Sequence, residues 1–180
     1  MVFRSKLRTT FRTGGFTIVE LLIVVVVIAI LAAISVVAYS GIQSRAQDAK
    51  IKSDLAMLQK AITVARINSG TPLFNITQHG APEAGCLGKA TGTDLATLNK
   101  SSDSCWTLYN TFLDRVSNSA NIDVRGMTDP WGRPYYVNPN EDENTTSHVC
   151  MADRIGVYSQ PFVYWTAGQY IMVPLYKASC

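Results

Sequence analysis

Glu20 is the one charged residue in a 23-residue apolar segment that runs from Phe16 to Ala38 and reads FTIVELLIVVVVIAILAAISVVA. A charged side chain inside lipid is costly, and such residues usually mark a function. Two interpretations are open. Glu20 lies one turn into the segment, so its carboxylate can reach back to the interface and gain from the positive end of a helix dipole. Alternatively, the carboxylate pairs with a group on a neighbouring chain.

Four cysteines form the second set of residues with available chemistry: Cys86, Cys105, Cys150 and Cys180. All lie beyond the apolar segment, none belongs to a CxxC pair, and no histidine stands at zinc-finger spacing from one. An even number of spaced cysteines after an export signal indicates two disulfides in an oxidising compartment, and four reduced core cysteines are the alternative. Three connectivities exist, and we favour Cys86–Cys105 with Cys150–Cys180.

The apolar segment predicts a membrane helix. At 1.5 Å per residue it spans roughly 34 Å, enough to cross a bilayer core of about 30 Å. Three interpretations compete. The segment is an uncleaved anchor, or a signal peptide cut before Tyr39, or a helix whose leader is cut between Gly15 and Phe16. Apolar cores of secretory signal peptides usually run about 7–15 residues, which argues against the second.

The stretch from Gly14 to Leu22, GGFTIVELL, spans the end of a 15-residue leader that has four basic residues and no acidic one. It resembles the class III leader of type IV prepilins and pseudopilins. The resemblance implies that a prepilin peptidase and methyltransferase cuts after Gly15 and methylates Phe16. It also implies a role for Glu20 in assembly, in which its carboxylate pairs with the Phe16 amine of a neighbouring subunit.

The resemblance also implies partners and location. The expected partners are other pilin-like subunits in a polymer, the processing enzyme, an inner-membrane assembly machinery, and membrane lipid before assembly. We expect a single-pass protein of the bacterial cytoplasmic membrane with a cytoplasmic N-terminus. After assembly it would belong to an extracellular or periplasmic filament. The basic leader favours this orientation.

Behind the membrane segment, the sequence predicts that the helix continues without proline to Asn68, with Ser40-Gly41 as a weak point. An apolar stripe recurs at spacings of four and three, which favours packing against the protein's own head: Ile51, Leu55, Leu58, Ile62 and Ala65. We expect the charged residues of this stretch, Arg66 among them, to lie largely off the stripe. Gly70 and Pro72 mark the end of the helix.

The expected fold is α+β: a long N-terminal helix, membrane-spanning and then amphipathic, packed on a small antiparallel β-sheet head. The expected divisions are a cleaved leader (1–15), the helix (16–69, with 16–38 in the membrane or filament core) and the head (70–180). Residues 70–92 read as a loop-rich connection and Ser104–Val116 as a second helix. Five short strands are expected in an antiparallel meander: Tyr135–Val137, Val149–Met151, Ile155–Tyr158, Phe162–Trp165 and Gln169–Val173.

The head contains Asp129-Pro-Trp-Gly-Arg-Pro-Tyr135, which resembles the DPWGxPY turn of the major pseudopilins of type II secretion. In that family a calcium site lies in the following loop. Here residues 138–144, NPNEDEN, are rich in oxygen ligands but lack the spacing of an EF-hand. We favour a solvated turn over a calcium site and expect no cofactor. The turn itself needs only prolines and a glycine, with Trp131 and Tyr135 fastening it to the head.

Charge and motifs exclude several classes of function. The net charge is +3, and removal of the leader's four basic residues leaves −1, so nothing favours nucleic acid as a partner. The motifs of ATPases, zinc proteases and serine hydrolases are absent, and we do not expect an enzyme. The leading hypothesis is a structural subunit of a type IV pilus or pilus-like filament. The alternatives are a type II secretion pseudopilin and an exported or membrane-anchored binding domain.

Overall fold

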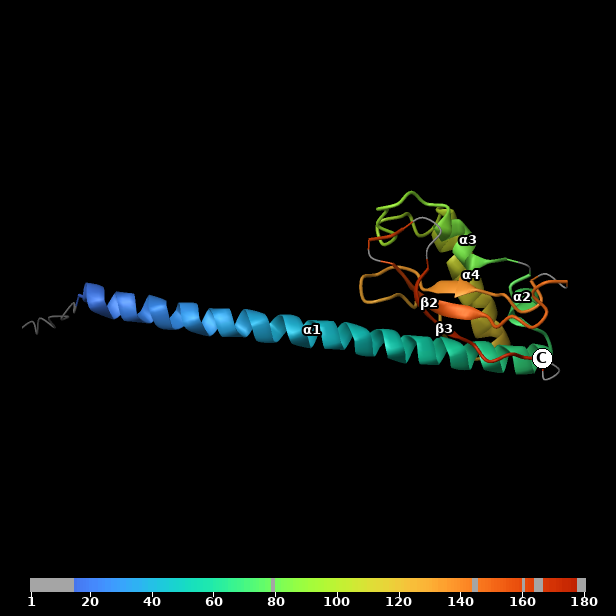
Figure 1. Ribbon diagram of the computed structural model, residues 1–180, viewed down its shortest axis with the longest axis horizontal. Coiled ribbons are helices and arrows are strands. Elements are labelled where there is room, and N and C mark those ends of the chain that lie inside the picture. The colour runs from blue at the N-terminus through green and yellow to red at the C-terminus, as the bar shows by residue number, and fades with distance from the viewer. Residues whose placement is uncertain (1–14, 79, 144–145, 160, 164–166, 178–180) are drawn as a thin grey trace, which may run out of the picture. The chain divides into compact units, whose positions relative to one another are not determined.

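The structure is a computed structural model that describes residues 15–78, 80–143, 146–159, 161–163 and 167–177. The chain divides into two compact units, Met1–Arg45 and Ala46–Cys180. The elements in chain order are α1 (Ile18–Ser69), α2 (Leu73–Ile76), α3 (Pro82–Leu87), α4 (Ser104–Ala120), β1 (Tyr136–Asn138), β2 (Arg154–Tyr158) and β3 (Ala167–Met172) (Figure 1). The predicted α+β class, with a long N-terminal helix and a small antiparallel sheet, is confirmed.

The first unit consists of the apolar part of α1. Helix is the state expected here, because a segment in lipid must satisfy its backbone hydrogen bonds internally. The helix continues through Ser40 and Gly41, where the sequence predicted a weak point. By length and composition alone, α1 is the one helix in the described chain that could cross a membrane.

The second unit begins with the amphipathic part of α1. The predicted stripe is confirmed: Leu55, Leu58, Ile62 and Ala65 are buried. Burying each large aliphatic side chain contributes about 1.5–3 kcal/mol. The helix ends at Ser69, and the predicted stop residue Gly70 follows it. Gly70 has a positive φ of 68°, which suits glycine, and its N–H donates to the carbonyl of Arg66 at 2.8 Å.

Helix α4 supplies the other helical face of the core. Asp103 caps it by accepting a hydrogen bond from the Cys105 N–H at 2.9 Å. Its buried residues share one core cluster with the α1 stripe and the sheet, and Trp106, Phe112 and Val116 are among them. Residues 70–92, predicted as loop-rich, contain the short helices α2 and α3.

The sheet is a three-stranded antiparallel meander of order β1-β2-β3. Tyr136 lies opposite Gly156, and Gly156 lies opposite Tyr170 on the other side. A Cβ on Gly156 would collide with the backbone of Gln169 and with Tyr170, so this crossing requires glycine. A second core cluster, around Tyr158, Phe162 and Cys86, includes residues of α3 and the sheet.

Three of the five predicted strands are confirmed, with bounds shifted by one or two residues. The prediction for Val149–Met151 is wrong, because these residues form a turn and its exit. Phe162 and Val163 are also outside any strand, and the rest of that predicted strand lies outside the described residues. Short apolar runs mislead here because Phe162 is buried by aromatic packing rather than by strand pairing.

Candidate functional site

Glu20 and Thr17 cap the first turn of α1 reciprocally. The Thr17 N–H and hydroxyl both donate to Glu20 Oε2 at 2.8 Å, and the Glu20 N–H donates to Thr17 Oγ1 at 3.2 Å. This arrangement is a capping box, which satisfies backbone donors that a helix start leaves open. The role of Thr17 was not predicted, although the spacing Thr-x-x-Glu ahead of an apolar run was an available signal.

The structure places the predicted N-terminal site residues together at the start of α1. Gly15 and Phe16 directly precede the capped turn, and the Phe16 side chain is 88% exposed. The cleavage of the Gly15–Phe16 bond, the methylation of Phe16 and the assembly role of Glu20 remain predictions. Of the leader, residues 1–14 lie outside the described residues.

The described large apolar side chains in the first part of α1 are exposed within their own unit. From Ile18 to Val36, every large apolar side chain is 48–85% exposed. Each such side chain favours removal from water by roughly 1.5–3 kcal/mol when fully buried. Lipid or other apolar helices must therefore cover this surface. An α-helix is suited to both surroundings because it satisfies its backbone hydrogen bonds internally.

The cysteine prediction is confirmed for its first pair. Cys86 of α3 and Cys105 of α4 form a disulfide with a Cα–Cα distance of 4.3 Å and a sequence separation of 19. The bond fastens the short helix α3 to α4 and closes the loop between them. Cys180 lies outside the described residues, so the Cys150–Cys180 pair stays a prediction.

Arg66 corrects the prediction that the charged residues lie off the helix stripe. Its side chain is 2% exposed and forms an ion pair with Asp153, while Glu141 Oε2 lies 3.9 Å from the guanidinium. The position four residues after Ile62, at the edge of the stripe, was the available signal for its burial. The two acids stand far apart in the sequence, and no pattern identified them.

The same charged group holds the end of the described chain. Arg66 donates to the carbonyl of Pro174 at 2.6 Å. The carboxylate of Glu141 accepts the N–H groups of Tyr176 and Lys177, each at 2.9 Å. Burial, together with the nearby Glu141, raises the pKa of Asp153, and Arg66 opposes that rise. The group therefore fastens the C-terminal segment to the end of α1.

The DPWGRPY segment forms a turn held by an ion pair. Asp129 and Arg133 are both 1% exposed at the side chain, with a 2.5 Å ion-pair distance, and Asp129 also accepts the Trp131 and Arg133 N–H groups. Tyr135 is buried and donates to Asp54 at 2.6 Å. Trp131 is 46% exposed, so its predicted fastening role is wrong and Asp129 performs it.

The prediction of a solvated turn in the following loop is wrong. Asn140 and Glu141 are buried, and Glu141 serves the backbone of the C-terminal segment. Within the ranges that the structure describes, no group of three or more His, Cys, Asp or Glu side chains could hold a metal ion. The oxygen-rich sequence is explained here by these backbone contacts.

Glu83 of α3 is a buried acid that the sequence analysis did not identify. Glu83 is 6% exposed, and among the described residues its Oε2 atom has no hydrogen-bond partner. Burial is the main cause that raises the pKa of Glu83 to about 8, and the nearby acids Glu143 and Asp153 add to it. The carboxyl is therefore neutral at pH 7 and suits the apolar contact between α3 and the sheet.

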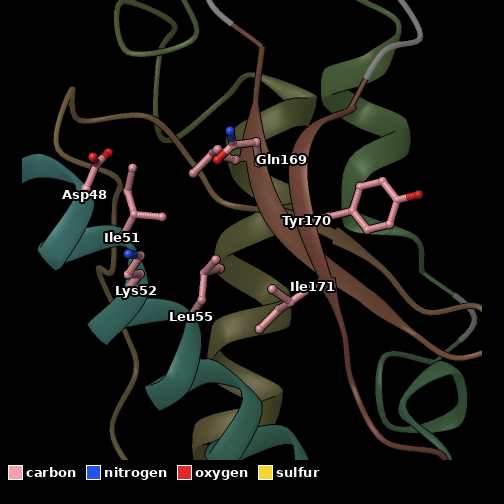
Figure 2. A pocket seen from close by; sticks show the side chains of 8 residues that line it. Asp48, Ile51, Lys52, Leu55, Gln169, Tyr170 and Ile171 are labelled. Carbon is pink, nitrogen blue, oxygen red and sulfur yellow. The ribbon is translucent and has the colours of Figure 1, made fainter.

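A groove of about 620 Å³ lies between α1 and β3. Figure 2 shows the α1 side chains Ile51, Lys52 and Leu55 facing it from one side and Ile171 of β3 from the other. A second cavity of about 320 Å³ shares part of its lining and extends to Trp131.

Comparisons with known proteins agree with the N-terminal site. Residues 11–36 match the family described as "Prokaryotic N-terminal methylation motif". The chain is similar to fimbrial protein Q of Moraxella bovis, with 30% identity over 116 residues that cover 62% of this chain and 74% of the relative. It is also similar to the type IV major alpha-pilin of Moraxella bovis, with 38% identity over 61 residues, or 34% of this chain and 38% of the relative. No solved structure matches significantly.

Proposed function

This chain belongs to the type IV pilin family as a structural pilin subunit, and we propose that it enters its filament through the processed start of α1. Pilin-like polymerisation, processing by a prepilin peptidase, membrane anchoring and a place in a surface filament accompany family membership. The two alternatives, a secretion pseudopilin and an exported binding domain, are not favoured by these relatives.

The observation that carries the proposal is the placement of Glu20 beside Phe16. Cleavage after Gly15 would create an amine on Phe16, next to the helix turn that Thr17 and Glu20 close. Both capping bonds go to Oε2 of Glu20, and among the described residues Oε1 accepts none. The carboxylate can therefore receive a neighbouring copy's Phe16 amine while its own helix stays capped.

This pairing would set the register of packed α1 helices. An ammonium and a carboxylate are each expensive in an apolar surrounding, and pairing offsets much of that cost. Apolar contacts between α1 helices do not fix their relative position, because the hydrophobic effect is non-directional. The charged pair would supply the specific contact. A copy out of register would leave both charges without partners.

The remaining steps involve other molecules. Membrane lipid would cover the apolar part of α1 before assembly, and an inner-membrane machinery driven by other proteins would extract it. The basic leader favours a cytoplasmic N-terminus. After assembly, the apolar parts of α1 would cover one another in the filament core, with the heads outside.

The test compares Glu20→Ala and Glu20→Gln with Gln43→Ala, a control on an exposed position of the same helix. Processing, measured as intact mass, should be normal in all three. The filament fraction should fall at least tenfold for both Glu20 variants and stay near the parental level for the control. Parental filament yield from a processed Glu20→Ala protein would refute the role of Glu20.

A further inference from the structure

Strand β3 lies at the edge of the sheet that the structure describes, where the Met172 carbonyl accepts a hydrogen bond from Gln59 of α1 at 3.4 Å. It ends the sheet order β1-β2-β3, and its sequence AGQYIM contains no charge and no proline. Its large side chains are exposed on both faces, with Ile171 39% and Met172 51% exposed. Natural edge strands are commonly blunted by charge, proline or a covering element, so this edge is suited to being covered by another chain.

The groove beside β3 is largely apolar. Ile51, Leu55 and Ile171 form its apolar surface, and Asp48 and Lys52 stand at its rim. Among the ion pairs of the described residues, neither rim charge takes part in one. Figure 2 shows Asp48 and Lys52 on successive turns of α1, on the side of the groove opposite Gln169. The groove is large enough for an aliphatic side chain. Its rim carries an acid and a base that can pair with charged groups beside that side chain.

Ile67 is the most exposed large apolar side chain of the second unit, at 68% among its described residues. It lies on α1 near the C-terminal end of the helix, 16 residues after Ile51. At 1.5 Å per residue, the two positions are about 24 Å apart along the helix. The exposed Ile67 side chain and the apolar groove therefore lie at different heights along α1.

We propose that Ile67 of one copy inserts into the Asp48–Ile171 groove of a second neighbouring copy in the filament, offset by about 24 Å along the helix and therefore not the copy that pairs with it through Glu20 and Phe16, an inference that rests on the proposed function. Because the two surfaces differ, the contact is heterologous and repeats without closing, as a filament requires. Pairing of two β3 edges with each other would instead be isologous and would close a dimer.

Charge complementarity supports this pairing of surfaces. Lys60 is exposed two helical turns before Ile67. If Ile67 of one copy stands level with Ile51 of the next and the helices run parallel, Lys60 stands about one turn below Asp48. A lysine side chain can cover that distance, so the rim acid would gain a partner from the neighbouring copy.

Substitutions test the contact without disturbing the core. Ile67→Asp changes an exposed residue, and Ile171→Asp places a charge in the groove wall. Val163→Asp is the matched control, because Val163 is 40% exposed against 39% for Ile171 and does not line the groove. We expect the filament fraction to fall at least tenfold for the first two and less than twofold for the control. Equal effects in all three would overturn the proposal.

Site-specific photo-crosslinking identifies the two surfaces directly. A benzoylphenylalanine replacing Gln169, at the groove, is activated in assembled filaments, and the crosslinked residue of the second copy is mapped by mass spectrometry. We expect a ladder of multimers whose crosslinks fall within residues 60–68. Crosslinks to β3, dimers without higher multimers, or intact filaments without crosslinks overturn the proposal. If the parent chain itself forms no filaments, the proposed function fails first.

Discussion

Two stretches of the same helix meet opposite surroundings. The stretch before Val36 exposes all its large apolar side chains, whereas Leu58 and Ile62 near the other end are fully buried. The second stretch has its packing partners in the same chain, in α4 and the sheet. Among the described residues of its own unit the first stretch has no such partners, so it needs lipid or other copies to cover it. Substitutions in the first stretch should therefore reduce assembly, and substitutions in the second stretch should reduce the stability of the head.

The largest expected effect concerns Arg66 in the head. Arg66→Met should lower the free energy of unfolding by about 3–5 kcal/mol, because it leaves the buried acids Asp153 and Glu141 without their cation. Chemical denaturation of the full chain in detergent, followed by tryptophan fluorescence, measures it. Lys60→Met, exposed on the same helix, should change stability by less than about 0.5 kcal/mol. An unchanged midpoint for Arg66→Met would break the comparison.

Removal of the Cys86–Cys105 disulfide should also lower the stability of the head. Replacing both cysteines by serine should cost roughly 3 kcal/mol, because the bond constrains a 19-residue separation in the unfolded chain. The same denaturation assay measures it, and the leader should still be processed normally. A parent protein whose Cys86 and Cys105 thiols react with iodoacetamide under native conditions would contradict this bond.

Glu83 should make head stability depend on pH. Its pKa is about 8 when folded, against 4.5 ordinarily, so the unfolded chain loses this proton first as pH rises. Stability from this group is therefore complete below pH 4.5 and is lost between about pH 4.5 and 8. At roughly 1.4 kcal/mol per pKa unit, the loss reaches several kcal/mol.

Glu83→Gln should flatten that dependence and make the head more stable than the parent above pH 8. Melting temperatures from pH 4 to 9 measure the difference. Asp153, whose pKa is also raised, retains its own contribution to the pH dependence of stability in the variant. A variant whose melting temperature follows the parental pH profile would show that Glu83 is not the titrating group.

The smallest effect is expected at the start of the first stretch. Thr17→Val keeps the shape of the side chain but removes the hydroxyl that bonds Glu20, and capping losses of this kind cost about 1 kcal/mol. Filament yield should fall two- to fivefold while the melting temperature of the head stays unchanged. Thr17→Ser should restore the yield. A shift in the melting temperature of the head for Thr17→Val would contradict the separation of assembly from head stability.

The long-range periodic features were predictable from the sequence. The apolar run at Ile18–Val36 and the stripe through Leu58 and Ile62 follow from hydropathy and spacing, and both are confirmed. The Gly70 stop follows from local backbone chemistry. The leader resemblance directed attention to Gly15, Phe16 and Glu20, which the structure places at one helix end.

Features that depend on tertiary contact were not predictable in the same way. Arg66 has an ordinary charged side chain until Asp153 and Glu141 meet it from distant parts of the chain. Val149–Met151 resembles a strand in composition, yet these residues form a turn and its exit. Trp131 resembles a core residue by type, and the buried Asp129–Arg133 pair takes that place instead.

The intact mass and N-terminal sequence of the full protein, isolated from its filaments, test the central claim most directly. The account predicts a mature chain that begins at Phe16 with a methylated amine, so that Glu20 lies in the first turn of the assembled helix. A chain that begins at Tyr39, or one that retains Met1, would contradict it.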